Sequence, residues 1–222
     1  MKYNLKNNLL IWSIILATTL LFMIFFIDIR LATFIQNNID NTSLLYKIFS
    51  IITLFGSFKY IVLINIIIFS YLLFMFKKHK NDKNYKGRFY MMIYGICGEI
   101  LSVIATQLLK FIFGRSRPFN FFALNDGNMF TFFNFQYEYV SFPSGHSSGI
   151  WALIACLLFV FKDNKYSKIL ILFGLLISIS RIILNVHYLS DVFFGATLST
   201  FITWYTVIYL NKVNSRLKVF DY

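Results

Sequence analysis

Three short polar segments contain the residues of this 222-residue chain whose types and spacing could do chemistry. They interrupt an otherwise apolar sequence and include two of its three histidines. In chain order the segments are Lys110 to Arg117-Pro118, then Pro143-Ser144-Gly145-His146, then Ser180-Arg181 followed by His187 and Asp191. Together they supply cations, imidazoles and a carboxylate, the groups needed to bind an anion and transfer it.

The three cations, Lys110, Arg117 and Arg181, have no matching acidic cluster, and such a group favours an anion. Guanidinium groups suit phosphate oxygens because they donate two parallel hydrogen bonds. If the interval from Lys110 to Arg117 is helical, it spans two turns and both side chains point the same way. Ser144 and Gly145 add a helix N-terminus, whose free N–H groups and dipole favour an anion, with Ser144 as the N-cap.

The two histidines suggest a mechanism. His187 and Asp191 are four residues apart, so the carboxylate can fix the tautomer of His187 and leave its other nitrogen as a nucleophile. His146 can then protonate the departing oxygen. This set is sufficient for phosphoryl transfer by double displacement without a metal. Asp191, with Glu138 and Asp126 in the intervening loop, is a thin ligand set for a two-metal site, and we expect no metal and no cofactor.

Each feature taken alone has a plainer explanation. A lysine at the end of an apolar segment is usually an interfacial anchor, an isolated His-Asp pair is usually a structural contact, and a Pro-Ser-Gly run is usually a turn. Their convergence on one membrane face favours the functional interpretation.

The composition indicates an integral membrane protein. Hydrophobic residues make up 58% of the chain and charged residues 14%, with a mean hydropathy of +0.67, whereas soluble domains are about half apolar and a quarter charged. These values exclude a disordered chain and argue against a soluble globule. Cys97 and Cys156 both lie in apolar runs, which excludes a disulfide framework as the organising principle.

We predict an all-α, polytopic membrane bundle of six transmembrane helices in a single domain, residues 1–222, because a bilayer core needs about 20 apolar residues per helix. The predicted spans cover residues 9–27, 60–76, 90–109, 148–161, 169–184 and 192–210. The first is too long for a signal peptide, and no small-residue cleavage pattern follows it. Residues 44–56 are expected to form an amphipathic surface helix. The alternative is one tilted span over 44–76, which would place Lys59 in the hydrocarbon.

The basic residues orient the bundle. Fourteen of the 21 Lys and Arg residues fall in four segments, 1–8, 77–88, 162–168 and 212–218. The positive-inside rule places these segments and both termini in the cytoplasm, and the three polar segments on the extracytoplasmic face. The net charge of +12 is then a topology signal, and we expect no nucleic-acid partner. The long outside loop, 115–147, is rich in Phe and Tyr, which indicates a packed, membrane-contacting loop.

At the three polar segments the sequence resembles the type 2 phosphatidic acid phosphatase (PAP2) superfamily of integral membrane lipid phosphatases. The family signature reads Lys, six residues, Arg-Pro; then Pro-Ser-Gly-His; then Ser-Arg, five residues, His, three residues, Asp. All three parts occur in order between residues 110 and 191. The resemblance implies a phosphohistidine intermediate on His187, orientation of that ring by Asp191, and a general acid at His146. It implies phosphate binding by Lys110, Arg117, Ser144, the Gly145 backbone N–H and Arg181.

The compact six-span form with an aromatic loop resembles the lipid A phosphatases of that family, including the 4′-phosphatase branch, and this favours the 4′-phosphate over the 1-phosphate. Undecaprenyl diphosphate and phosphatidylglycerophosphate are the alternative lipid substrates. The heavy use of Phe, Ile, Asn and Lys suggests an AT-rich bacterial genome, and hence a plasma or inner membrane. The expected partners are the bilayer and a phosphorylated lipid, and no obligate protein partner is inferred.

Other classes of protein share some of these features. Vanadium haloperoxidases carry the same motifs but are soluble, which six spans argue against. A transporter also has polar residues at span ends, but it more often shows paired half-helices broken by Gly or Pro near the midplane. Both prolines here lie inside the signature. A non-catalytic scaffold would not need an intact His187.

Two further charged residues are candidates for an accessory role. Glu99 lies eleven residues before Lys110 and shares its helix face. An intramembrane carboxylate is a functional candidate, but a bundle contact, for example with Gln107, is the interpretation we favour. Arg115 lies between the signature cations and either contacts the substrate head group or has a structural or interfacial role.

Overall fold

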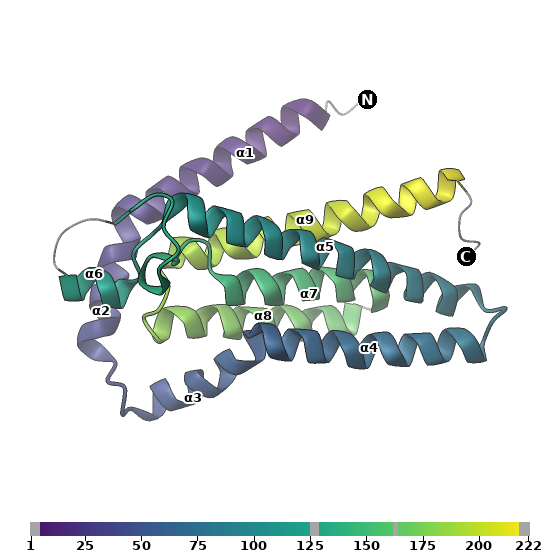
Figure 1. Ribbon diagram of the computed structural model, residues 1–222, viewed down its shortest axis with the longest axis horizontal. Helices are drawn as coiled ribbons and strands as arrows, with labels where there is room; N and C mark the ends of the chain where they lie inside the picture. The colour runs from purple at the N-terminus through teal and green to yellow at the C-terminus, as the bar shows by residue number, and fades with distance from the viewer. Residues whose placement is uncertain (1–4, 125–128, 162–163, 218–222) are drawn as a thin grey trace.

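The structure, a computed structural model, describes residues 5–124, 129–161 and 164–217, and the regular elements of these residues are helices (Figure 1). The strand-like contact found among them is an isolated bridge between Arg115 and Phe130. The predicted all-α class is therefore confirmed. Four residues of the loop and basic segments discussed above lie outside the described ranges: Lys2, Asp126, Lys162 and Lys218.

Long helices dominate the chain. In order, the elements are α1 (Leu5–Phe22), a π-helical turn η1 (Met23–Ile27), α2 (Asp28–Asn38), α3 (Leu44–Ile52), a 3-10 turn η2 (Thr53–Gly56), α4 (Phe58–Lys78), α5 (Lys83–Phe113), α6 (Pro118–Leu124), η3 (Tyr137–Tyr139), α7 (Gly145–Phe161), α8 (Asn164–Ile183) and α9 (Leu189–Leu217). Five helical stretches of the described chain are long and apolar enough to cross a membrane. α7, with 17 residues, is shorter, so the sixth span stays a prediction.

The first apolar helix is longer than the predicted span 9–27. The turn η1 does not end the helix, and α2 carries it on to Asn38. In Figure 1, α1 diverges from the bundle, whereas α2 lies at its end, where it contacts α8 and α9. Phe25 is 76% exposed, as expected for a side chain that faces lipid.

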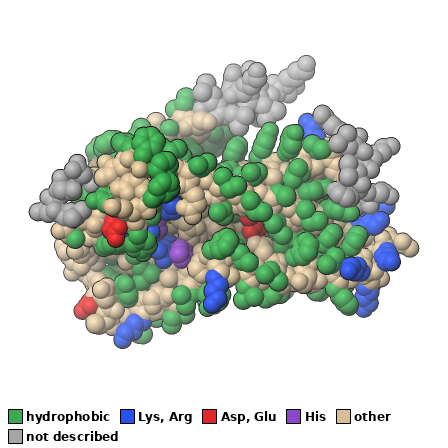
Figure 2. Space-filling view, viewed as in Figure 1, with side chains coloured by type: hydrophobic (Ala, Val, Ile, Leu, Met, Phe, Trp, Pro, Cys, Tyr) green, Lys and Arg blue, Asp and Glu red, His purple; other side chains and the backbone are tan. Residues whose placement is uncertain are grey.

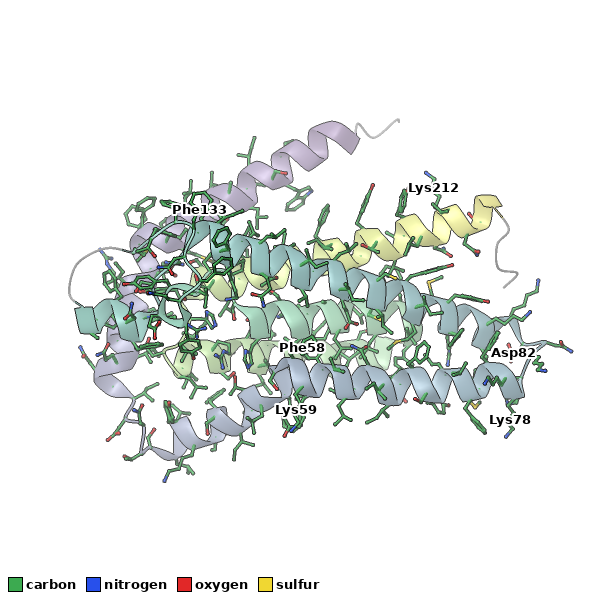
Figure 3. The ribbon with its side chains drawn as sticks, in the orientation of Figure 1. Phe58, Lys59, Lys78, Asp82, Phe133 and Lys212 are labelled. Atoms are coloured by element: carbon green, nitrogen blue, oxygen red, sulfur yellow. The ribbon has the colours of Figure 1, made fainter. Side chains whose placement is uncertain are left out.

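The amphipathic helix predicted over 44–56 is present as α3 and η2. The Ser43 side chain caps α3 by accepting a hydrogen bond from the Tyr46 backbone nitrogen at 3.2 Å. Ser57 then adopts extended backbone, with φ −74° and ψ 149°, before α4 begins. The alternative of one continuous span over 44–76 is therefore wrong, and Lys59 lies at the exposed start of α4 (Figure 3).

The helices α5, α7 and α9 form the centre of the bundle, and α4 and α8 pack against α7. Glycines let the central helices approach closely. A Cβ atom at Gly95 would overlap the Cys156 side chain, and one at Gly98 would lie 2.7 Å from the Thr203 Cα atom. Such close packing fixes the relative positions of the helix ends, and those ends carry the polar segments.

The two ends of the bundle differ in composition. Lys78, Asp82 and Lys212 mark one end, which also holds the turn between α4 and α5, and Phe133 marks the other (Figure 3). Figure 2 shows Lys and Arg side chains gathered at the first end and histidine in a hollow toward the second. This distribution is the one that the positive-inside interpretation requires, while the membrane face itself stays a prediction.

Candidate active site

The three polar segments meet at the end of the bundle that Phe133 marks. The backbone nitrogen of Ser144 donates to the backbone oxygen of Asp191 at 3.0 Å, which joins the second segment to the third. Lys110 reaches the loop just before the second segment, where its Nζ atom donates to the Val140 oxygen at 2.5 Å. The three signature cations act electrostatically on both imidazoles. The structure thus brings together the residues that the sequence singles out.

Lys110 and Arg117 converge by a different route from the predicted one. α5 ends at Phe113, and Gly114 follows in the left-handed region with φ 49°, which glycine adopts without a steric penalty. A Cβ atom at Gly114 would also lie 2.5 Å from the Thr131 oxygen. The interval is therefore not two turns of helix. The chain turns at Gly114, and Arg117 still acts electrostatically on Lys110.

The aromatic loop holds Arg117 in place. Its backbone nitrogen donates to the Glu138 oxygen at 2.8 Å, its Nε donates to the Tyr137 oxygen at 2.9 Å, and its guanidinium carbon lies 4.1 Å from the centre of the Tyr137 ring. Burial lowers the pKa of Arg117 from its ordinary value. The loop itself packs on α5, where the Phe111 and Phe135 rings stack with centres 4.1 Å apart.

Of the buried donors that have no hydrogen-bond partner among the described residues, two belong to the predicted phosphate-binding set: the Ser144 hydroxyl and the Nε atom of Arg181. Ser144 stands immediately before α7, but the predicted side-chain cap is absent because its hydroxyl bonds to no backbone amide. Arg181 uses Nη1 to donate to the Thr53 hydroxyl at 2.7 Å, which fixes it to the turn after α3. Buried donors are usually paired, so these two fit an anion.

His187 and Asp191 stand at the start of α9. Asp191 Oδ2 accepts from the Tyr188 backbone nitrogen at 2.9 Å and from the Ser141 hydroxyl at 2.6 Å. His187 Nδ1 lies 3.6 Å from the same oxygen and 3.4 Å from Ser141 Oγ. The distance to Asp191 exceeds that of an ordinary hydrogen bond, so the carboxylate acts on the ring chiefly as a charge. Nε2 is the ring nitrogen that does not face it.

The charge state of His187 suits a nucleophile. The residue is 3% exposed, and burial lowers its pKa well below the ordinary value, with Lys110, Arg181 and Arg117 lowering it further. The imidazole is therefore neutral at pH 7, and a neutral ring nitrogen carries the lone pair that an attack requires.

His146 lies where the polar site meets an apolar groove. The groove has a volume of about 960 Å³ and runs between α4, α5 and α7, with Gly145 and His146 lining one end. Its wall on α5 extends from Gln107 to Ile93, a helix length of about 21 Å at 1.5 Å per residue. Gly145 also lies beside the site, since a Cβ atom there would be 3.7 Å from Lys110 Cε.

Comparison with known proteins agrees with this geometry. The sequence pattern of the PAP2 superfamily matches residues 90–215, which contain all three polar segments. This chain belongs to the PAP2 superfamily.

Two curated relatives are named lipid A 1-phosphatase. The one from Rhizobium johnstonii is 30% identical over 122 residues, which cover 54% of this chain and 48% of that protein. The one from Rhizobium etli is 28% identical over 163 residues, which cover 71% of this chain and 68% of that protein. The chain thus spans about half the length of the first relative.

Two crystal structures have a similar fold. One is LpxE of Aquifex aeolicus, with a TM-score of 0.60 and 24% identity, covering 84% of this chain and 98% of that chain. The other is a transmembrane PAP2 type phosphatidylglycerolphosphate phosphatase of Bacillus subtilis, with a TM-score of 0.59 and 16% identity, covering 92% of this chain and 94% of that chain. At these identities the likeness supports the PAP2 fold.

The two accessory candidates lie in different places. Arg115 is 0% exposed and contacts Asp191 and Asp28, so of its predicted alternatives these contacts support the structural role. Glu99 lies on the groove wall and accepts a hydrogen bond from Asn65 Nδ2 at 2.6 Å. The bundle contact favoured for Glu99 is therefore present, with Asn65 in the place suggested for Gln107.

Three residues around the PAP2 signature are not identified by the sequence analysis: Asp28, Ser141 and Ser190. Asp28 carries the same signal as Glu99, a carboxylate in an apolar helix, but the predicted span ends one residue before it. The two serines carry no signal, since hydroxyl residues are common. Within the described residues, no three His, Cys, Asp or Glu side chains gather into a set that could hold a metal ion.

Proposed function

We propose that this protein is a phosphatase that removes phosphate from a membrane lipid through a phosphohistidine intermediate, without a metal ion. One observation carries the proposal: three cations, two unpartnered donors and a buried imidazole meet at one end of an apolar groove. The cations and donors suit a phosphate, the imidazole suits an attack on phosphorus, and the groove suits a hydrocarbon chain.

The proposed reaction has two displacements. The signature cations and the Ser144 hydroxyl hold the phosphate oxygens. His187 Nε2 attacks phosphorus, the bond from phosphorus to the lipid oxygen breaks, and His146 gives that oxygen a proton. A water molecule then attacks the phosphohistidine and gives a proton to His146, the phosphorus–nitrogen bond breaks, and inorganic phosphate leaves. Asp191 stabilises the positive charge that develops on His187.

The groove supports a lipid substrate. It starts at His146, its walls include Ile66, Ile100 and Ile104, and these side chains are exposed at the side of the bundle. Its volume of about 960 Å³ lies within the range of ligand sites, about 300–1,000 Å³. An acyl chain in the groove would stay beside the bilayer while its head group reaches the cations.

Lipid A is the substrate we propose, with the 1-phosphate as the group removed. Both curated relatives carry the name lipid A 1-phosphatase, and we prefer their phosphate position to the 4′-position that the sequence resemblance favours. Undecaprenyl diphosphate and phosphatidylglycerophosphate remain the alternatives. The proposed location is the bacterial inner membrane with the site on the extracytoplasmic face, which the basic side chains at the opposite end support.

A side-by-side comparison of three lipid substrates tests this proposal. The purified full chain is incubated with lipid A, undecaprenyl diphosphate and phosphatidylglycerophosphate in separate arms containing excess EDTA, and inorganic phosphate is measured. Mass spectrometry of the lipid A product locates the phosphate removed. We expect release from lipid A at the 1-position. Loss of turnover on chelation would contradict the metal-independent mechanism.

Histidine variants supply the matched controls. His187→Ala should abolish phosphate release, whereas His79→Ala, at the basic end of the bundle, should leave it unchanged. Wild-type turnover by His187→Ala would refute the nucleophile assignment. If phosphate is released only from one of the other two lipids, the protein is still a phosphatase, but that lipid is its substrate in place of lipid A.

A further inference from the structure

We propose that Asp28 and Arg115 are positioning residues for this reaction: they hold the Asp191 carboxylate, whose charge acts on the His187 ring, so that α2 belongs to the catalytic apparatus. The inference rests on the proposed phosphatase function. Neither residue is part of the three-part signature, and both are buried.

Arg115 lies between two carboxylates. Its Nη1 atom is 2.5 Å from Asp191 Oδ1, and its Nη2 atom is 2.8 Å from Asp28 Oδ2. Nη1 also donates to the Ser190 hydroxyl oxygen at 2.7 Å, and the guanidinium carbon lies 4.2 Å from the centre of the Tyr188 ring. Because the guanidinium is planar with a fixed fork of donors, it sets the separation and orientation of the two carboxylates.

Asp28 joins this arginine to the start of α9. Its Oδ1 atom accepts from the Ser190 backbone nitrogen at 3.0 Å, and the Ser190 hydroxyl donates to its Oδ2 atom. Ser190 is the second residue of α9, where free N–H groups and the helix dipole stabilise a carboxylate. Asp28 follows directly on the π-helical turn η1, and such a turn changes which side chains of a helix face the bundle.

Both carboxylate oxygens of Asp191 are held by hydrogen bonds. Oδ1 is bonded to Arg115, and Oδ2 is bonded to the Ser141 hydroxyl and the Tyr188 backbone nitrogen. Because Arg115 is shared with Asp28, the Asp191 carboxylate keeps a negative charge beside His187. A ring that becomes positive when it is phosphorylated is stabilised by that charge. The pair therefore acts on the reaction through Asp191, without contact with the substrate.

The first test replaces Asp28 by Asn, which keeps the size of the side chain and an acceptor for Ser190 but removes the charge. In the purified full chain, acting on the lipid that the wild type hydrolyses, kcat and KM are measured together with inhibition by inorganic phosphate. We expect kcat to fall by about 10- to 100-fold, the size of loss seen when hydrogen-bond partners that orient metal-ligating side chains are replaced. KM and the inhibition constant of phosphate should not change, because the cation pocket is intact.

A second variant tests the inference if Asp28→Asn fails to fold. Arg115→Lys keeps the positive charge, but one ammonium group cannot reproduce the two-sided fork, so kcat should again fall without a change in KM. The matched control is Asp40→Asn, an exposed carboxylate just after α2 that accepts a hydrogen bond from the Thr42 backbone nitrogen at 3.0 Å. It should behave as the wild type.

Three results would overturn the inference. An active wild type with fully active Asp28→Asn and Arg115→Lys variants refutes the positioning role alone. A parallel loss of kcat, phosphate affinity and thermal stability in both variants shows that the pair only anchors the fold. A wild type that releases no phosphate from any of the three lipids removes the proposed function, and this inference with it.

Discussion

Ser144 and Asp191 are joined backbone to backbone, with the Ser144 nitrogen 3.0 Å from the Asp191 oxygen. The bond joins the start of α7 to the first turn of α9. It therefore fixes the position of the unpartnered Ser144 hydroxyl relative to His187. Gly195, one turn further along α9, allows this approach. A Cβ atom there would lie 2.8 Å from the Ser144 oxygen and 2.9 Å from Ser148 Oγ.

Gly195→Ala should therefore push α9 away from α7. Forcing an extra methyl into a packed contact destabilises by about 1–3 kcal/mol, and the displaced Asp191 should lower kcat as well. Thermal unfolding in detergent and the rate of phosphate release measure the two effects. Gly174→Ala is the comparison, since the three heavy atoms nearest to a Cβ atom there are side-chain atoms of Ile154 and Trp151. An equal loss of kcat in both variants would contradict the argument.

Tyr137 should contribute to phosphate binding through Arg117. Its ring centre lies 4.1 Å from the guanidinium carbon, and cation–π contacts are worth about 0.5–2 kcal/mol. Tyr137→Ala should raise KM about 2- to 30-fold, because each 1.4 kcal/mol is tenfold, with little change in kcat. Tyr137→Phe keeps the ring and should lose less. If the two variants raise KM equally, the ring does not support Arg117.

Much of the bundle could be predicted from composition and spacing, because apolar length and basic loops are local properties. The bend at Gly114 could not. The spacing of Lys110 and Arg117 fits two helical turns, yet φ 49° at Gly114 ends α5 between them. A glycine near the end of an apolar run marks either a helix interior or a left-handed cap, and only the packing of the loop decides which.

The Asp28–Arg115 contact could not be predicted for a different reason. It joins residues 87 positions apart, and no local pattern records such a pairing. The apolar run before Asp28 resembles a complete span, so the helix is expected to end at that point. The continuation through η1 depends on contacts of α2 with α8 and α9, which sequence periodicity does not contain.

His146 should act on the leaving group. A general acid contributes about 10²–10⁴-fold to rate, but only where the departing oxygen needs a proton. His146→Gln should slow the first displacement on the lipid by this factor and that on p-nitrophenyl phosphate, whose leaving group is stable as an anion, by much less. The rate at which the leaving group is released in a single turnover gives the comparison, because hydrolysis of the phosphohistidine is common to both substrates. An equal loss in that first step would assign His146 to phosphate binding instead.

The lowered pKa of His187 predicts two effects of pH. Because the folded ring stays neutral well below its ordinary pKa, kcat/KM should show no acid limb near pH 6.5 from this group. The unfolded histidine has a pKa of about 6.5, so below that pH the unfolded state binds a proton that the folded state does not. The free energy of unfolding should therefore fall as pH drops below about 6.5.

Comparing unfolding at pH 7 and pH 5 in the wild type and in His187→Gln tests this assignment. The variant cannot bind the extra proton, so its stability should depend less steeply on pH. The same dependence in both proteins would show that other groups cause the acid sensitivity. An acid limb near pH 6.5 in the wild-type kcat/KM profile, in addition to the one that the substrate phosphate itself gives, would show that the ring titrates at its ordinary value.

The groove should govern activity on lipids and not on soluble esters. Val103 lines the groove on α5, whereas Leu101, on the same helix, is exposed and does not. Val103→Trp fills part of the space proposed for the acyl chain, so KM for the lipid should rise about tenfold, a loss of about 1.4 kcal/mol. KM for p-nitrophenyl phosphate should change far less, because that ester has no chain to place. Leu101→Trp places the same indole ring toward lipid and should leave both values as in the wild type. The two variants introduce the same side chain on the same helix. If only Val103→Trp loses activity on the lipid, the cause is the filled groove and not a general disturbance of α5. If both variants lose activity equally, the hydrocarbon chain does not bind in this groove.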